Sequence, residues 1–201
     1  MPVETPLYEA AASPLAVEPM TGMRGIVAIS GRRVLQARGR FDDYEAFVPA
    51  EHRTALATVT AGEVLPMSLA HVHVGAIDRL GLSRDEARSL GGEMSRAMHG
   101  IVFSTIVRLG GQLGASPWLV FSKAPKVWAR MYCGGAVAIF RRDERAARVA
   151  VWGDPLARYA LHREAVGGGL LHVVEACCTR PVMYELTEYR TPAEFSFLIR
   201  W

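Results

Sequence analysis

Residues 136–152, AVAIFRRDERAARVAVW, carry the pattern that decides the fold class. The runs 136–141 and 147–152 are apolar with a period of two, and they lie on either side of the charged segment RRDER. A period of two is typical of β-strands, and a polar tip between two such runs predicts a β-hairpin. Residues 182–189 and 195–201 alternate in the same way on either side of a short turn. They predict a second hairpin at the end of the chain.

Helical patterns precede each hairpin. Pro49 and Pro66 suit the first turn of a helix, where the missing N–H of proline costs nothing. Ser83 followed by Glu86 is a capping-box signature, and it opens the longest predicted helix. The segment 24–30 (RGIVAIS) is apolar and β-branched and favours a strand or a buried lead-in, followed by an exposed arginine-rich connection. The predicted helices cover residues 51–60, 67–80, 83–109, 156–165 and 170–178, with shorter segments after Ser116 and Pro125.

Glycines interrupt two of these helical patterns. Gly91, Gly92 and Gly100 lie inside the longest predicted helix, where each glycine costs about 1 kcal/mol relative to alanine. Their presence suggests close helix packing or space for a ligand. The run Gly167–Gly169 has no following Lys-Ser/Thr pair, and it predicts a break between two helices rather than a phosphate loop.

The order of elements is helices, hairpin, helices, hairpin, which predicts a single α+β domain over residues 24–201. In this interpretation a helical N-terminal half packs on one face of an antiparallel sheet, and the two C-terminal hairpins make that sheet. Residues 1–23 contain four prolines and are expected to form an irregular N-terminal arm.

Composition excludes several classes of protein. Of the 201 residues, 50% are hydrophobic and 21% charged, as in ordinary globular proteins, and the net charge of +3 gives no reason to expect a nucleic-acid partner. No uncharged apolar run reaches the roughly 18 residues that a membrane span needs. Three cysteines in a chain of this length make no disulfide framework, and no signal peptide opens the sequence. We therefore expect a cytoplasmic location.

No motif names a reaction. His71 and His73 resemble a metal pair, but on a helix positions i and i+2 point roughly 200° apart, so ordinary helix histidines are the preferred interpretation. His99 could ligate haem iron or be a core side chain, and nothing nearby specifies haem. Cys177 and Cys178 could be a redox pair, yet two buried small side chains explain them more simply. We expect no metal, no cofactor and no catalytic site.

A ligand pocket is predicted between the longest helix and the sheet. Flexible methionine side chains suit a surface that repacks around an apolar guest, although a helical apolar stripe is also the normal pattern of a core. The candidate pocket residues are Met94, Met98, His99, Gly100, Ile101, Val102, Trp128 and Tyr132.

Several short motifs carry a resemblance to a known family. They are Val48-Pro49-Ala50-Glu51-His52-Arg53 with Leu56, the Leu65-Pro66 helix start, Pro125-Lys126-Val127-Trp128 with Tyr132 and Gly134, and the closing residues Phe195, Phe197, Ile199 and Trp201. Over about residues 24–201 the chain resembles an uncharacterised myxobacterial paralogous domain family. That family is similar to the 4-vinyl reductase-type domain, the haem-based nitric-oxide sensor domain and the small subunits of the TRAPP vesicle-tethering complex.

The resemblance implies helices on one face of an antiparallel sheet, with a small or hydrophobic ligand held between the two layers. The last hairpin turn, residues 189–194, lacks the cysteines that vinyl reductase-type domains often carry there. The Tyr-x-Ser-x-Arg motif of the haem sensor is also absent, so the resemblance does not extend to haem.

Three functions follow in order of preference. The first is a non-enzymatic module that binds a hydrophobic small molecule and serves regulation or signalling. The second is a ligand-free protein–protein interaction scaffold, and the third is a thiol- or histidine-dependent enzyme. A homodimer is expected because Phe195, Phe197 and Ile199 on one face of the last strand, with Leu198 on the other, would leave apolar surface wet in a monomer.

Overall fold

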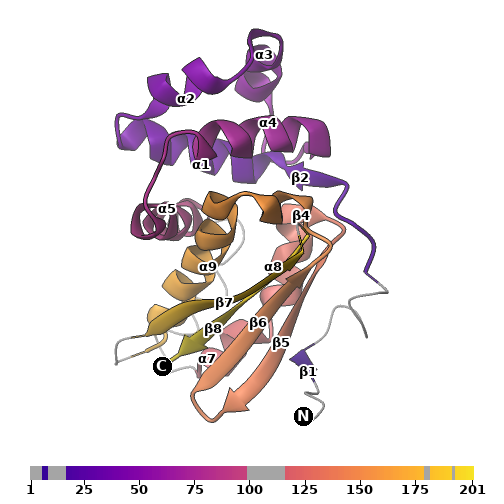
Figure 1. The fold of residues 1–201 in the computed structure, drawn as a ribbon, viewed down its shortest axis with the longest axis vertical. Helices are drawn as coiled ribbons and strands as arrows, with labels where there is room; N and C mark the ends of the chain where they lie inside the picture. The colour runs from indigo at the N-terminus through magenta and orange to yellow at the C-terminus, as the bar shows by residue number, and fades with distance from the viewer. Residues whose placement is uncertain (1–5, 9–16, 99–115, 179–181, 192) are drawn as a thin grey trace.

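The structure is a computed structural model, and it describes residues 6–8, 17–98, 116–178, 182–191 and 193–201. The described helices are α1 (Gly25–Ala37), α2 (Phe41–Phe47), α3 (Ala50–Thr58), α4 (Met67–Asp78), α5 (Arg84–Ala97), α7 (Pro117–Phe121), α8 (Ala124–Met131) and α9 (Ala160–Glu175), with a 3-10 turn at Pro155–Arg158 (Figure 1). The described strands are β1 (Pro6–Tyr8), β2 (Gly22–Arg24), β3 (Val64–Pro66), β4 (Tyr132–Cys133), β5 (Ala136–Asp143), β6 (Ala146–Trp152), β7 (Met183–Thr191) and β8 (Glu194–Arg200).

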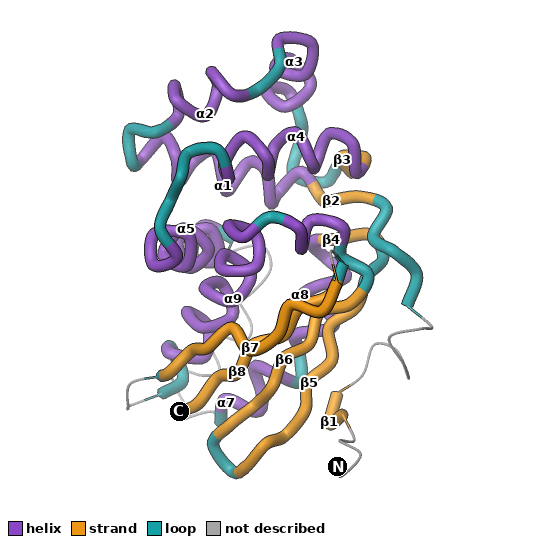
Figure 2. The backbone as a smooth tube through the Cα atoms, viewed as in Figure 1, coloured by secondary structure: helices purple, strands orange, loops and turns teal. Residues whose placement is uncertain are grey.

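Both predicted hairpins are confirmed, and they join into one antiparallel sheet. The strand order of this sheet is β1-β5-β6-β8-β7 (Figure 2). Val137 of β5 pairs with Val151 of β6, and Val149 of β6 pairs with Phe197 of β8. These alternate positions put their side chains on the face that the helices cover. The predicted α+β class is therefore confirmed.

A small second sheet connects the N-terminal helices to the rest of the molecule. β2 pairs with β3, which leads into α4, and also with β4, which follows α8. Figure 1 shows α1 to α4 gathered at one end, above α9 and the end of the main sheet. The helical N-terminal half and the sheet therefore meet at an internal boundary made by α4, α5, α8 and α9.

Of the two alternatives for residues 24–30, a strand or a buried lead-in, the strand is wrong. Only Arg24 belongs to a strand, β2, and α1 begins at Gly25. Ile26, Val27, Ser30 and Val34 are buried at helical spacing, so tertiary packing overrides the weak β preference of this apolar run. The arginines expected in an exposed connection lie instead on α1 and just after it.

The N-terminal arm, residues 1–23, is expected from the sequence to be irregular. It contains β1, which pairs with β5, and most of β2.

The helix break predicted at Gly167–Gly169 is also wrong, because α9 runs without interruption from Ala160 to Glu175. A Cβ on Gly168 would overlap the carbonyl oxygen of Arg88 on α5. A Cβ on Gly91 of α5 would overlap the carbonyl oxygen of Ala165 on α9. These glycines allow α5 and α9 to pack backbone to backbone, which is close helix packing of the kind expected for Gly91.

The predicted start of α5 is confirmed. The Ser83 hydroxyl accepts from the backbone N–H of Glu86, and the Glu86 carboxylate accepts from the backbone N–H of Ser83. The helix ends at Ala97 with Met98 as its C-cap. The predicted continuation to residue 109 lies outside the described residues. No helix in the described ranges is both long and apolar enough to cross a membrane.

The last strand is covered within one chain. Phe195, Phe197 and Ile199 are at most 2% exposed, and Leu198 on the other face is half-buried. The expectation that a monomer leaves the first face of this hairpin wet is therefore wrong, since the helices already cover it.

Candidate ligand cavity

A cavity of about 130 Å³ lies where the N-terminal helices meet α5, α8, α9 and the inner face of the sheet. Its lining is predominantly apolar. The sheet contributes Val137, Val149, Val151 and Phe197, and four methionines, Met23, Met94, Met98 and Met131, surround the space. A cavity of similar volume lined by aliphatic and aromatic side chains holds one benzene molecule. The space therefore suits a ligand with the size of a single substituted ring.

The structure brings together four of the predicted pocket residues. Met94 of α5, its C-cap Met98, Trp128 of α8 and Tyr132 of β4 all line the cavity. The rings of Trp128 and Tyr132 lie with centroids 4.3 Å apart, and the Trp128 indole N–H donates to the carbonyl oxygen of Gly134 at 3.2 Å. These two aromatic residues therefore form a fixed wall. The other predicted residues, His99, Gly100, Ile101 and Val102, lie outside the described residues.

His73 lies on the inner face of α4 and lines the cavity. Its Nδ1 lies 2.8 Å from the hydroxyl oxygen of Tyr44, with which it shares a hydrogen bond. Burial lowers the pKa of His73 to about 3, so its imidazole is neutral at physiological pH. Its other side lies against α1, where a Cβ on Gly31 would be 3.3 Å from Nε2.

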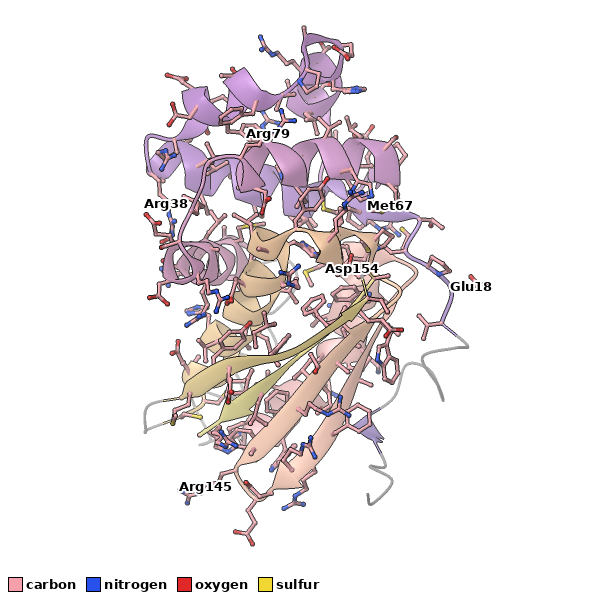
Figure 3. The ribbon with its side chains drawn as sticks, viewed as in Figure 1. Glu18, Arg38, Met67, Arg79, Arg145 and Asp154 are labelled. Atoms are coloured by element: carbon pink, nitrogen blue, oxygen red, sulfur yellow. The ribbon has the colours of Figure 1, made fainter. Side chains whose placement is uncertain are left out.

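His162 of α9 also lines the cavity. Its Nε2–H donates to the carboxylate of Asp154 at 2.8 Å, and both residues are buried. The second Asp154 oxygen accepts from the backbone N–H of Leu156 at 2.9 Å and caps the 3-10 turn. Figure 3 shows Asp154 where the end of the sheet meets the N-terminal helices, far from Arg145 at the tip of the first hairpin. The pair fixes the imidazole ring of His162 at the cavity wall.

Ser95 is a third polar side chain at the cavity. It lies on α5 between Met94 and Met98, is 2% exposed, and faces α9 near Gly169. Its hydroxyl oxygen is buried and makes no hydrogen bond within the described part of the chain. An unpaired buried hydroxyl is destabilising, so its presence at a cavity wall calls for a physical reason.

Permanently charged side chains are absent from the described lining. Among the described residues that border the cavity there is no lysine, arginine, aspartate or glutamate. The surrounding apolar side chains would strip water from any charged group placed inside, at a large cost in free energy. The cavity therefore favours an uncharged guest.

His71 and the three cysteines are the other candidate residues that the structure describes. His71 points away from His73 and packs against Tyr159, with ring centroids 5.8 Å apart, as the i, i+2 spacing predicts. The described residues contain no group of three histidine, cysteine or acidic side chains that could hold a metal ion. Cys177 and Cys178 are free thiols whose pKa values are raised by burial, which disfavours the nucleophilic thiolate. Cys133 is a half-buried free thiol in β4.

Sequence reasoning missed three polar residues at this cavity: His73 as a lining residue, His162 and Ser95. It treated His73 as one of two similar helix histidines, although only His73 is enclosed. The spacing Asp154 to His162, with a proline-started turn between them, is the local signal that places the carboxylate beside the imidazole. Nothing local singles out Ser95, because its environment is made by α9.

Comparisons with known proteins agree with this architecture. No family model matches the sequence, and no curated protein sequence matches it either. Solved structures of H-NOX proteins, the fold of the haem nitric-oxide sensor, match 89% of the chain. The Fe(II) unliganded H-NOX protein from K. algicida has a TM-score of 0.65 at 9% identity over 96% of its own chain. A mutant of the T. tengcongensis H-NOX protein has a TM-score of 0.60 at 9% identity over 97% of its chain.

A third similar structure concerns the modulation of haem redox potential through protein-induced porphyrin distortion. It has a TM-score of 0.58 at 9% identity over all of its chain. At such identities the likeness concerns the fold alone. The protein therefore has an H-NOX-like α+β fold, which agrees with the haem-sensor part of the resemblance seen in the sequence.

Proposed function

We propose that this protein is a non-enzymatic sensor or regulatory domain that binds a small hydrophobic molecule in the cavity between α5, α9 and the sheet. The observation that carries the proposal is the cavity itself, an uncharged, largely apolar space of about 130 Å³. Membership of the myxobacterial family, with its vinyl reductase-type and TRAPP relatives, is part of this proposal and rests on the short sequence motifs.

The described lining does not fit a haem, the group named for one of the similar structures. The volume matches a single aromatic ring rather than a porphyrin. The described lining has no lysine or arginine to pair with haem propionates. Of the two histidines in that lining, His73 is held between Tyr44 and Gly31, and His162 has Nε2 bonded to Asp154. The described lining therefore supports a guest smaller than a haem.

A cavity-filling substitution tests the proposal. Val166 of α9 lines the cavity and is half-buried, so Val166→Phe would place a ring in the space. We expect this variant to keep its melting temperature and to lose binding of toluene, measured by isothermal titration calorimetry. Val72→Phe is the matched control, because Val72 is half-buried on α4 and is not part of the described cavity lining. Toluene binding that is absent from the parent protein would overturn the proposal.

A ligand-free scaffold that acts as a homodimer is the second candidate. The observation that favours it is the outer strand β7, at the edge of the sheet, where Met183 is 66% exposed. An exposed edge strand can pair with a strand from a second copy of the chain. Light scattering at high micromolar concentration is expected to report a dimer under this proposal, and a monomer would contradict it.

A further inference from the structure

The position of Ser95 suggests what kind of molecule the cavity binds. Three of the other polar side chains at the cavity have a hydrogen-bond partner within the protein: His73 bonds to Tyr44, His162 to Asp154, and the Trp128 indole to Gly134. Ser95 borders the same space with a buried hydroxyl that has none in the described structure.

The surroundings of Ser95 explain why its hydroxyl has no partner among the residues that the structure describes. α5 and α9 pack closely on one side of it, where a Cβ on Gly169 would be 3.8 Å from the Cβ of Ser95. The neighbouring lining residues Met94, Met98 and Leu170 offer no side-chain oxygen or nitrogen. Within the described structure, a group inside the cavity is what remains to pair with this hydroxyl.

We infer that the cavity binds an uncharged molecule of about one ring in size, whose hydroxyl or carbonyl group forms a hydrogen bond with the Ser95 hydroxyl. The inference rests on the proposed function, since it names the class of ligand for the same cavity. The apolar lining holds the body of the ligand, and the polar group satisfies the buried hydroxyl of Ser95. A charged ligand is disfavoured, because the described lining has no lysine, arginine, aspartate or glutamate to pair with it.

Phenol and toluene are the probes for this inference, because they have nearly the same shape and differ by a hydroxyl group in place of a methyl group. Their dissociation constants are measured by isothermal titration calorimetry for the parent protein, Ser95→Ala and Ser30→Ala. Ser30 is the matched control, since it is equally buried, on α1, and is not part of the described cavity lining. We expect Ser95→Ala to lower the affinity for phenol relative to toluene about tenfold, as one neutral hydrogen bond predicts. Ser30→Ala is expected to keep the parental ratio of the dissociation constants for phenol and toluene.

The outcomes of this experiment separate the inference about the ligand's polar group from the proposed function. If toluene binds and the ratio is the same in Ser95→Ala, the inference about the polar group is wrong and the proposed function stands. If neither phenol nor toluene binds the parent protein, both the inference and the proposed function are wrong. Ligand-free Ser95→Ala is expected to melt at or above the parental temperature, because it removes an unpaired buried hydroxyl. A lower melting temperature would show that the hydroxyl is already bonded within the protein, and it would overturn the inference.

Discussion

Gly91 of α5 and Ala165 of α9 meet so closely that a Cβ on Gly91 would overlap the carbonyl oxygen of Ala165. Both residues also border the cavity. The helix crossing therefore sets the position of one cavity wall, and the absence of a side chain at residue 91 is what allows the two backbones to approach. Stability and cavity shape depend on the same contact.

The Gly91→Ala substitution is expected to destabilise the protein by at least about 2 kcal/mol, because rigid backbone must move to make room. Gly92→Ala is the matched control. A Cβ at Gly92 would lie 3.6 Å from the carbonyl oxygen of Gly168, an ordinary contact, and alanine is favoured over glycine in a helix by about 1 kcal/mol. Urea unfolding of both variants checks the contrast, and equal stabilities would contradict the close crossing.

The pH dependence of stability is expected to report the burial of His73. The folded protein keeps this imidazole neutral down to pH 3 or so, whereas the unfolded chain protonates it near its ordinary pKa of 6.5. Between these values the unfolded state binds more protons, so stability is lost as the pH falls. The expected loss from His73 is about 2 kcal/mol between pH 7 and pH 5.

The His73→Gln variant provides the comparison, because glutamine does not titrate. Its free energy of unfolding, from urea titrations at pH 7 and pH 5, is expected to depend less on pH than that of the parent protein. His71 and His172, whose pKa values are also lowered by burial, remain in both proteins. If the free energy of unfolding of the variant depends on pH as strongly as that of the parent protein, His73 is not enclosed.

Tyr44→Phe is expected to destabilise the protein by about 1–3 kcal/mol, because it leaves Nδ1 of His73 buried without a partner. Phe41 packs against Tyr44 at 5.8 Å between ring centroids, and the phenylalanine ring preserves that contact. The loss is therefore assigned to the hydroxyl. Thermal unfolding measures it, and full stability would show that the hydrogen bond to His73 is unimportant.

Asp154→Ala is expected to be more damaging, with a loss of about 2–5 kcal/mol. The fully buried carboxylate serves both the His162 ring and the backbone N–H of Leu156, so its removal leaves two buried donors open. Asp143→Ala is a suitable comparison, since it removes an exposed carboxylate from the first hairpin. Chemical unfolding of both variants is the measurement, and similar small losses would contradict the structural role of Asp154.

The sequence predicts the hairpins and the cap at Ser83 because these depend on local patterns. Alternation over residues 136–152 determines the β5–β6 hairpin, and the Ser83–Glu86 pair determines where α5 begins. The N-terminus of α1 and the continuity of α9 depend instead on distant contacts. Gly168 is a helix breaker by propensity, but here its missing side chain is required by Arg88 on another helix.

The candidate site likewise combines residues that local patterns identify with residues whose role depends on distant contacts. Met94, Met98, Trp128 and Tyr132 are recognisable as lining residues because they are large and mostly apolar, and lie on α5 and α8 or directly after them. The role of Ser95 arises only when α9 packs against α5, and local periodicity contains no information about that packing. Polar groups at an otherwise apolar cavity are therefore the part that sequence reasoning misses.

The central claim, that the cavity takes up a small apolar molecule, is tested most directly by the methionine methyl resonances. Met23, Met94, Met98 and Met131 border the cavity, whereas Met183 is exposed and Met67 lies outside the described lining. During a titration with toluene, followed by NMR of methionine methyl groups, the four cavity resonances are expected to shift because an aromatic ring lies beside them. Those of Met67 and Met183 are expected to stay in place. Cavity resonances that do not move at saturating toluene would contradict the account.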